Sequence, residues 1–364
     1  MLLAAFVGGI HAQTVASGLQ PEVLTLDQAI SRASANEPAF AAAKAERQIA
    51  LLERTNARTA LLPTATYHNQ AIYTEPNGVP ASRIGQTTNA PSPIFIANNA
   101  VREYASQGVF NETLGLGQAG VIKLADANAA KAEAEAEVAR RGLVTTIVSL
   151  YYGTEAGQQK LQIVQQALAE TDHFVDITQK RETAREAAHA DVLKAQLQQQ
   201  QRQRDLVDAQ LAADKAKLEL AVLLYPDPAT PFSLAAADAP GVLPDRASID
   251  VLARKNNPEL RSALASLQIS QAEAYTSRAA LVPDLDLNFT YGIDATNFGL
   301  NGPDGIHNLG YSISAQLDIP VWDWLSTERK IKEARLREAA AKVSLTAAQR
   351  RLLVNLSEFY AEAS

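Results

Sequence analysis

The sequence predicts a mainly α-helical protein with a smaller β component, in which long coiled-coil-like helices are combined with four amphipathic strands. Three observations carry this prediction. A stretch of 31 residues occurs twice, each copy is followed by strand-like alternation, and no proline occurs between Pro93 and Pro226. Because proline breaks helices, so long an interval without one leaves room for helices longer than those of ordinary compact domains.

The repeated stretch aligns residues 33–63 with residues 253–283 without a gap, at a constant offset of 220. Twelve of the 31 positions are identical. Each copy opens on Asn-x-Pro, where proline suits the first turn of a helix, and closes on a proline that favours extended backbone before it. These prolines are Pro38 and Pro63 in the first copy and Pro258 and Pro283 in the second. The sequence therefore predicts two structural repeats, each beginning with a helix.

Apolar and polar residues alternate after the second copy, which predicts a pair of strands. The apolar positions are Leu285, Leu287, Phe289 and Tyr291, and then Tyr311 and Ile313. The polar positions are Asp286, Asn288 and Thr290, and then Ser312, Ser314 and Gln316. After the first copy the pattern is weaker. It predicts a strand at residues 66–73, a return strand around Tyr104–Asn111, and a long loop at Pro76–Asn99 between them.

Two series of apolar residues follow the three- and four-residue spacing of coiled coils. They predict two long helices joined by a polar reversal at Ala184–Asp191. The first series is Leu143, Ile147, Leu150, Gly157, Leu161, Val164, Leu168 and Val175. The second series is Leu193, Leu197, Val207, Leu211, Leu218 and Ala221. Gln200, Arg204 and Asp214 interrupt the second series, so we do not expect a uniformly apolar seam there.

These features divide the chain into four parts. Residues 1–18 resemble a secretory signal peptide or its remnant, because an apolar run is followed by small residues. The first structural repeat occupies residues 24–225, and a proline-rich linker follows at residues 226–248. The second repeat occupies residues 249–364 and lacks a counterpart of the first repeat's return helix, so we expect it to be C-terminally incomplete.

The alternating strands are long enough to cross a bilayer, but four strands cannot close a barrel, and lipid does not tolerate open strand edges. Three copies of the chain would supply twelve strands, which can close. We then expect the six apolar positions to face lipid and the six polar positions to face an aqueous lumen. Trp322 and Trp324 would suit an aromatic girdle at the end of the last strand. The alternative is one face of an ordinary soluble sheet.

The duplicated Asn-x-Pro helix, the two strand pairs and the long helices resemble the TolC family of outer-membrane efflux proteins. The segment Arg181–Ala195 is similar to the helix-tip segment of that family. The resemblance implies a homotrimer with a twelve-stranded outer-membrane β-barrel, continued by an α-helical tunnel in the periplasm. Its implied partners are a periplasmic adaptor (membrane fusion) protein, an inner-membrane efflux pump or type I secretion ATPase, and outer-membrane lipid.

The reversal between the long helices is the candidate adaptor contact, because an exposed turn can bind a partner without dismantling a duct. The candidate residues are Arg185, Glu186, His189 and Asp191. We also expect Asp191 to cap the returning helix. One departure from the family is Arg185, which stands where a glycine is usual. Arginine does not favour the positive φ of a tight turn, so the expected turn geometry is open at this position.

Composition argues against other function classes. A net charge of −7 disfavours nucleic acid as a partner, and the absence of cysteine excludes thiolate chemistry. We expect no catalytic residue, cofactor or metal, since the five histidines are isolated from one another. Asp284, Asp286 and Asp294 could suggest calcium, but a polar lumen explains their spacing better. The sequence thus predicts an exit duct for efflux or secretion. The alternative is a soluble periplasmic coiled-coil scaffold or adaptor.

Overall fold

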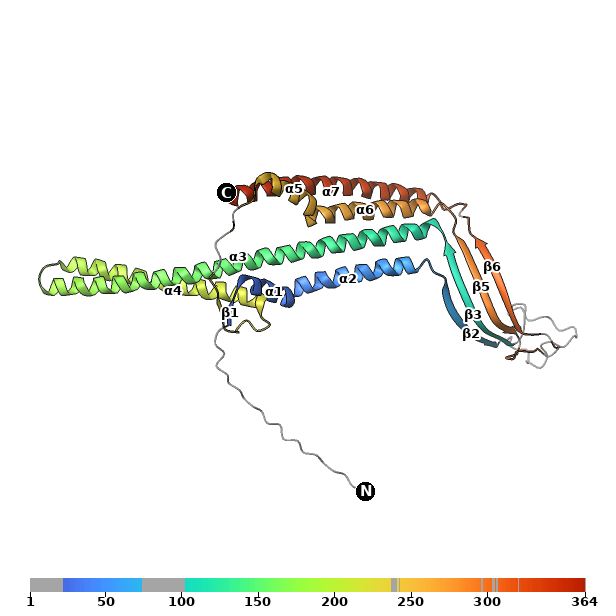
Figure 1. Cartoon of the computed structure of the whole chain (residues 1–364), viewed down its shortest axis with the longest axis horizontal. Coiled ribbons are helices and arrows are strands. Elements are labelled where there is room, and N and C mark those ends of the chain that lie inside the picture. The colour runs from blue at the N-terminus through green and yellow to red at the C-terminus, as the bar shows by residue number, and fades with distance from the viewer. Residues whose placement is uncertain are drawn as a thin grey trace, which may run out of the picture. The chain divides into compact units, whose positions relative to one another are not determined.

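The computed structural model of the chain describes residues 22–73, 102–236, 241, 243–295, 297–302, 305, 307–319 and 321–363. The predicted signal segment and the predicted loop at Pro76–Asn99 lie outside these residues. The described residues form two compact units (Figure 1). Unit 1 draws on Met1–Ala42 and Ala139–Val242, and unit 2 draws on Ala43–Val138 and Leu243–Ser364.

Helix boundaries recur at the offset of 220 that the sequence shows. The helices are α1 (Leu26–Asn36) and α2 (Pro38–Thr59), and then α5 (Arg246–Asn256) and α6 (Pro258–Ala279). Between the members of each pair one residue turns extended, Glu37 at φ −71° and Asn257 at φ −70°. The Asn257 side chain accepts a hydrogen bond of 2.8 Å from the Leu260 N–H, so Asn257 caps the helix that Pro258 opens.

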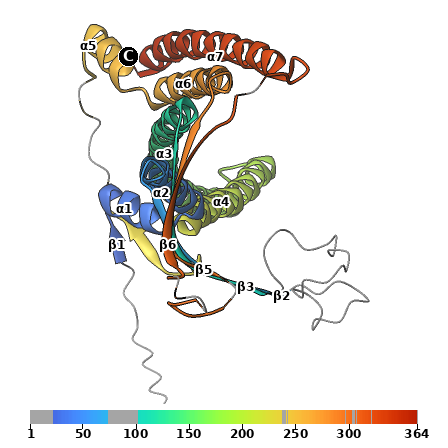
Figure 2. The ribbon, with the colours of Figure 1, turned by 90° about the vertical axis from the view of Figure 1, so that its right-hand side faces the viewer.

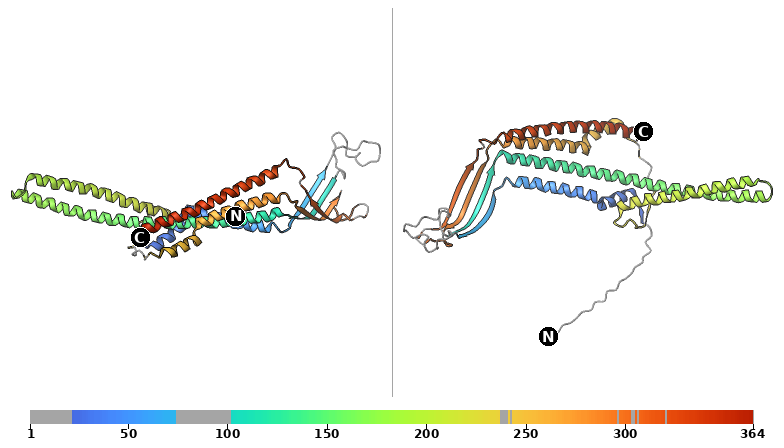
Figure 3. Two further views of the ribbon diagram at one scale, coloured as in Figure 1. Left: turned by 90° about the horizontal axis from the view of Figure 1, so that it is seen from above. Right: turned by 180° about the vertical axis from the view of Figure 1, so that it is seen from behind.

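Unit 1 contains a helical hairpin, visible in both views of Figure 3. The hairpin consists of α4 (His189–Leu224) and the C-terminal part of α3 (Leu116–Thr183). The predicted seam of α3 is confirmed, since Leu143, Ile147 and Val175 are buried. The reversal is confirmed as well, because it occupies the five residues between the two helices.

The predicted seam of α4 is wrong. Its residues Leu193, Leu197, Val207, Leu211 and Leu218 are exposed, and only Ala221 is buried. The buried positions are instead Val192, Ala195, Ala209, Ala213, Leu220, Ala221 and Leu224. The physical reason is close helix packing. A Cβ atom at Gly157 would be in van der Waals contact with the Cα atom of Ala213, at 3.5 Å, so the two helices approach closely there. Val192, Leu220 and Leu224 are large apolar residues of α4 that are buried, whereas the five large residues of the predicted seam are exposed.

The core of unit 1 surrounds Tyr151, whose ring is 1% exposed. Its hydroxyl lies 3.0 Å from the carbonyl oxygen of Leu24 and 2.7 Å from that of Ala235. Those carbonyls follow β1 (Glu22–Leu24) and β4 (Phe232–Leu234), which pair in parallel. Tyr151 thus ties this two-stranded sheet to α3. The rest of the core is Ala29, Ala33, Leu143, Ile147, Leu220, Ala221, Leu224 and Phe232.

Unit 2 contains an antiparallel four-stranded sheet with the order β2-β3-β5-β6. The strands are β2 (Thr64–Tyr73), β3 (Arg102–Leu114), β5 (Leu285–Ala295) and β6 (Leu309–Leu317). Both predicted strand pairs are therefore confirmed. Each strand connects at the same end of the sheet to a helix, namely to α2, α3, α6 or α7 (Ser326–Ala363) (Figures 1 and 2). In the described residues, the outer edges of β2 and β6 have no partner strand.

Two glycines allow the two strand pairs to lie against each other. A Cβ atom on Gly115 would lie 1.7 Å from the Asp284 Oδ1 atom, and one on Gly292 would lie 2.3 Å from the Ser106 carbonyl oxygen. At 292 the obstructing atoms are backbone, so only glycine fits there, whereas a Cβ atom at 115 would displace the Asp284 carboxylate. Gly115 also forms the strand-to-helix turn, since β3 ends at Leu114 and α3 begins at Leu116.

Arg185 adopts φ 62°, in the left-handed region, at the end of α3. The Glu186 N–H donates to the Arg181 carbonyl at 2.8 Å, and the Arg185 N–H donates to the Glu182 carbonyl at 2.8 Å. This pair of hydrogen bonds is the Schellman motif, in which a glycine usually occupies the left-handed position. The question that the sequence left open is thus answered. The turn has the geometry that glycine favours, with arginine in its place.

We expect Arg185→Gly to stabilise the turn. A left-handed non-glycine residue costs about 1–2 kcal/mol, and the greater freedom of glycine in the unfolded chain cancels part of this gain. The net gain of about 0.5–1 kcal/mol should slow hydrogen exchange at the amides of 185 and 186 by roughly two- to fivefold. Arg185→Ala is the matched control, because it removes the same side chain but keeps the strained backbone. Equal stabilisation by alanine would assign the effect to charge.

Candidate functional site

The register of the sheet places the predicted polar and apolar residues on opposite faces. Asp286 pairs with Gln316, Asn288 with Ser314, and Thr290 with Ser312. On the other face, Phe289 pairs with Ile313 and Tyr291 with Tyr311, while Leu285 and Leu287 occupy the same side of β5. Because successive side chains of a strand point to opposite faces, all twelve predicted positions divide into two sets of six as the alternation requires.

Hydrogen bonds connect the polar face across β3 and β5. Thr113 Oγ1 donates to Asp286 Oδ1 at 2.6 Å, and Gln107 Nε2 donates to Asp294 Oδ2 at 3.3 Å. Between these pairs the Asn288 side chain donates to Asn111, and it also accepts from Thr290. Such a layer of mutually bonded polar side chains suits a surface in contact with water. The sequence did not reveal the contribution of β3, whose alternation is poor.

The apolar face carries a row of aromatic rings that crosses three strands. The ring of Phe289 lies 6.0 Å from that of Phe110 and 6.5 Å from that of Tyr311. Tyr311 and Ile313 nevertheless remain more than 70% exposed. A soluble sheet buries such a face against a second layer, whereas an exposed apolar face of this extent marks an interaction surface.

Sequence reasoning missed polar groups on this apolar face. Ser106 Oγ lies 2.8 Å from the Tyr67 hydroxyl and donates to Asn69 Oδ1 at 2.9 Å. Glu112 lies opposite Leu287, and its Oε2 atom is buried without a hydrogen-bond partner. The residue types alone gave no signal of this, because the face that each β3 residue occupies follows from its register with β5.

The charges on the polar face share one sign. Among the strand residues whose side chains the structure describes, this face carries Glu103, Asp286 and Asp294 and no lysine or arginine. His68 is the one further titratable group on that face. A passage lined by this face would present a negative field to solutes.

The reversal after α3 brings the four candidate tip residues into one exposed turn. The His189 Nδ1 atom lies 2.7 Å from Glu182 Oε1, and Glu186 lies 4.0 Å from Arg181. The expectation that Asp191 caps α4 is wrong. The N-cap is Ala188, and it makes no side-chain hydrogen bond. Asp191 lies in the first turn of α4, and its carboxylate is 3.6 Å from the Lys194 ammonium. A negative charge there interacts favourably with the positive end of the helix dipole.

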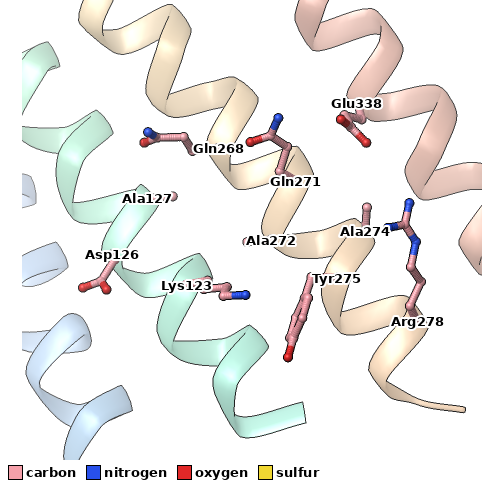
Figure 4. Close-up of a pocket in the computed structure, with 10 residues that line it drawn as sticks. All are labelled: Lys123, Asp126, Ala127, Gln268, Gln271, Ala272, Ala274, Tyr275, Arg278 and Glu338. Carbon is pink, nitrogen blue, oxygen red and sulfur yellow. The ribbon is translucent and has the colours of Figure 1, made fainter. Parts of the chain in front are cut away.

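A groove of about 580 Å³ lies between α3, α6 and α7 within unit 2 (Figure 4). The Lys123 ammonium stands 3.7 Å from the centroid of the Tyr275 ring, and Arg278 and Glu338 lie on the α7 side of α6. A hydrogen bond from Lys342 is the main cause that lowers the pKa of Glu338. The ten lining residues include no serine, threonine, cysteine or histidine. The sequence gave no sign of this groove.

Two further findings concern the described residues as a whole. No helix among them combines the length and the apolarity that a membrane span requires. Nowhere among them do three or more His, Cys, Asp or Glu side chains gather closely enough to hold a metal ion.

Two sequence comparisons found similar proteins. Residues 251–364 match the family model of the outer membrane efflux protein. The chain is 28% identical to Protein CyaE of Bordetella pertussis over 193 aligned residues. The aligned region covers 52% of this chain and 40% of that protein. The chain thus spans less than half the length of this curated relative.

Solved structures share the fold. The outer membrane protein VceC from Vibrio cholerae matches with a TM-score of 0.76 at 17% identity, over 93% of this chain and 78% of that chain. The Campylobacter jejuni CmeC outer membrane channel matches with a TM-score of 0.75 at 15% identity, over 93% and 73%. The chain therefore shares the fold of these outer membrane proteins, and its residues 251–364 match the family model of the outer membrane efflux protein.

Proposed function

We propose that this chain is one subunit of a homotrimeric exit duct in the outer membrane, with its helices in the periplasm, and that it serves efflux or secretion. It works with a periplasmic adaptor protein and with an inner-membrane pump or secretion ATPase. The observation that carries the proposal is the four-stranded sheet of unit 2. That sheet has one apolar face, one polar face and two outer edges without partners in the described residues.

The edges argue for assembly. In lipid, every backbone N–H and C=O group needs a partner inside the protein, so only a closed barrel of strands is stable. Pairing β2 of one copy with β6 of the next leaves no edge once the ring closes. Three copies give twelve strands, which lies within the range of bacterial barrels. The apolar face then meets lipid and the polar face lines the passage.

The exposed large apolar residues of α4 form a stripe that also supports assembly. The stripe consists of Leu193, Leu197, Val207, Leu211 and Leu218. Leu197 and Leu211 lie on the side of α4 roughly opposite Ala195 and Ala213, which pack toward α3. A helix in a closed ring of helices has a neighbour on each side and needs two seams, whereas a helix in an isolated hairpin needs one. We assign the outer stripe of α4 to a helix of a second copy of the chain.

Arginine substitutions test the two faces of the sheet. Leu287→Arg or Phe289→Arg should cost about 2–4 kcal/mol near the bilayer midplane, because the charge would enter lipid. Asn288→Arg and Thr290→Arg, each one residue further along β5, should be tolerated because they face water. The measurement is the yield of membrane-inserted trimer. Equal damage from both sets would contradict the assignment of faces.

Glutamate substitutions test the stripe of α4. Leu197→Glu combined with Leu211→Glu should abolish trimers, since two charges would be buried in the seam between copies. The control combines Gln198→Glu with Ala212→Glu, which adds the same charge at exposed positions outside the stripe. Chemical crosslinking in detergent measures the trimer. If the control loses trimers as readily as the stripe variant, the stripe is not the seam.

Substitutions in the turn between α3 and α4 test the proposed contact with the adaptor. Arg185→Glu combined with Glu186→Arg keeps the net charge but reverses its pattern on an exposed turn. We expect export to be lost while trimers and barrel remain, because the turn contributes little to the core. Lys194→Glu, on the nearby first turns of α4, serves as a charge-changing control. Normal export together with normal adaptor crosslinking would move the contact away from this turn.

A soluble coiled-coil scaffold or adaptor in the periplasm is the second candidate, favoured by the long hairpin of unit 1. It leaves the exposed apolar face of the sheet unexplained. Membrane fractionation separates the two candidates. A duct stays with outer membranes through a high-salt wash, whereas a scaffold held by surface charge is released.

A further inference from the structure

The internal repeat relates the two strand pairs of the sheet to each other. The offset of 220 that aligns the repeated stretches places Asn288 of β5 at the position of His68 in β2. Within the first pair, His68 lies opposite Gln107 of β3. Within the second pair, Asn288 lies opposite Ser314 of β6. Gln107 and Ser314 are therefore equivalent positions as well, so each residue of β3 has a counterpart in or beside β6.

One contact between the two strand pairs lies inside the chain. It joins β3 to β5 and sets Asn111 opposite Asn288, whose side chain donates a hydrogen bond to that of Asn111. The counterpart of Asn111 on β6 is Asp318, because each stands four residues beyond one of the two equivalent positions. When the same contact forms between two copies, from β6 of one to β2 of the next, it sets Asp318 opposite His68. We call this contact the strand seam.

The register that the repeat gives for the strand seam also matches the apolar residues of the two edges. It sets Ile319 opposite Tyr67, and Ile313 opposite Tyr73. All four side chains are exposed in the single chain, and the seam gives each an apolar neighbour across the strands. A shift by one residue would instead turn every apolar side chain of one edge to the polar face of the other.

On the polar face, each of the two facing residues contacts a glutamine of its own strand. The His68 Nε2 atom lies 3.3 Å from Gln70 Oε1, and Gln316 Nε2 donates to Asp318 Oδ2 at 3.0 Å. The same register sets these two glutamines opposite each other. All four side chains are exposed in the single chain. The edges thus carry matching groups, a carboxylate acceptor on β6 and an imidazole N–H donor on β2.

Charge on the polar face favours the same pair. Among the strand residues whose side chains the structure describes, His68 is the one group on this face that can carry a positive charge. The other titratable groups there are the carboxylates of Glu103, Asp286 and Asp294. Opposite charges that face each other across two strands stabilise a sheet, and like charges destabilise it. Asp318 therefore meets the one strand residue that can offset its charge.

We propose that His68 of one copy and Asp318 of the next form a polar contact at each strand seam of the ring, on the side of the sheet that faces water. The contact specifies the register between copies, since a slip by two residues would keep the faces but separate the pair. This inference rests on the proposed function, because it requires copies of the chain to close into a ring.

Because the chain has no cysteine, introduced cysteines report on the strand seam alone. Gln70→Cys with Gln316→Cys retains the pair and should give disulfide-linked dimers and trimers of the full chain in outer membranes after mild oxidation. Directly opposite Cβ atoms lie about 4.5–5.5 Å apart, within reach of a disulfide after small movements, whereas diagonal ones are farther apart. Two controls, Gln70→Cys with Ser314→Cys and Ile72→Cys with Gln316→Cys, represent slips of two residues in either direction and should link several-fold less.

The pair itself is tested in the background of the two cysteines at 70 and 316. His68→Asp sets two carboxylates opposite each other, so we expect the linked fraction to fall several-fold. Adding Asp318→His exchanges the two groups and should restore most of the linking. Linking that His68→Asp leaves unchanged, or an exchange that stays as weak as the single change, would overturn the pair.

Trimer formation and conductance of the cysteine-free chain separate this inference from the proposed function. Conducting trimers in which a control pair links best, or in which none of the three cysteine pairs links, would overturn the register and leave the duct intact. Linked dimers from Gln70→Cys alone would mean that β2 pairs with β2, which contradicts the head-to-tail ring as well. Absence of trimers and of conductance would overturn both proposals.

Discussion

A strand at the edge of a sheet presents a row of backbone N–H and C=O groups that need partners, and most of this architecture can be derived from that demand. Unit 2 supplies two such edges, β2 and β6, at opposite sides of one sheet. The two edges differ in sequence, so they are complementary rather than self-complementary. Contacts of this head-to-tail kind generate a ring when the rotation closes. A closed ring of sheets then requires the attached helices to be neighbours as well.

The helices show the same need for a neighbouring partner in the side chains that they expose. In an isolated hairpin, the large apolar residues of α4 would lie against α3 and its outer side would be polar. Along the middle of α4 the structure has small residues inside, such as Ala195 and Ala213, and large ones outside, such as Leu197 and Leu211. Toward the C-terminal end of the helix, Leu220 and Leu224 are buried in the core. Small residues let α3 and α4 approach closely. Large residues on the outer side suit a wider gap to a neighbouring helix, which a gently curved wall of helices provides.

Much of the fold could be predicted from the sequence because its signals are local. Prolines mark the starts and stops of α2 and α6, and alternation marks β5 and β6 without any knowledge of their partners. The inner side of α4 could not be predicted in this way. A coiled-coil pattern predicts which residues share one side of a helix. Whether the side with large residues or the side with small residues packs against α3 depends on the distance between the two helices. Gly157 and Ala213 mark a point where the two helices approach closely.

The candidate site shows the same division. The six polar and six apolar positions of β5 and β6 follow from period two alone, whereas Ser106, Asn111 and Glu112 acquire their partners from the register of β3 with its neighbours. At the tip, the sequence identified the turn but not its conformation. The hydrogen bonds of Glu186 and Arg185 to the end of α3 hold a left-handed residue there, although the residue is arginine.

The contact between Gly115 and Asp284 bears on the symmetry of the ring. Its two partners come from different repeats, since Asp284 stands at the offset position of Thr64. Around a trimer, six helix–strand junctions would therefore alternate between two kinds. One is the tight glycine–aspartate contact within a chain, and the other would join Thr64 to the connection between β6 and α7 of the adjoining chain. In the proposed trimer the duplication would give the ring pseudo-sixfold order, but the two halves of the chain would not be interchangeable. A ring built from six copies of either half would lack one of its two kinds of junction.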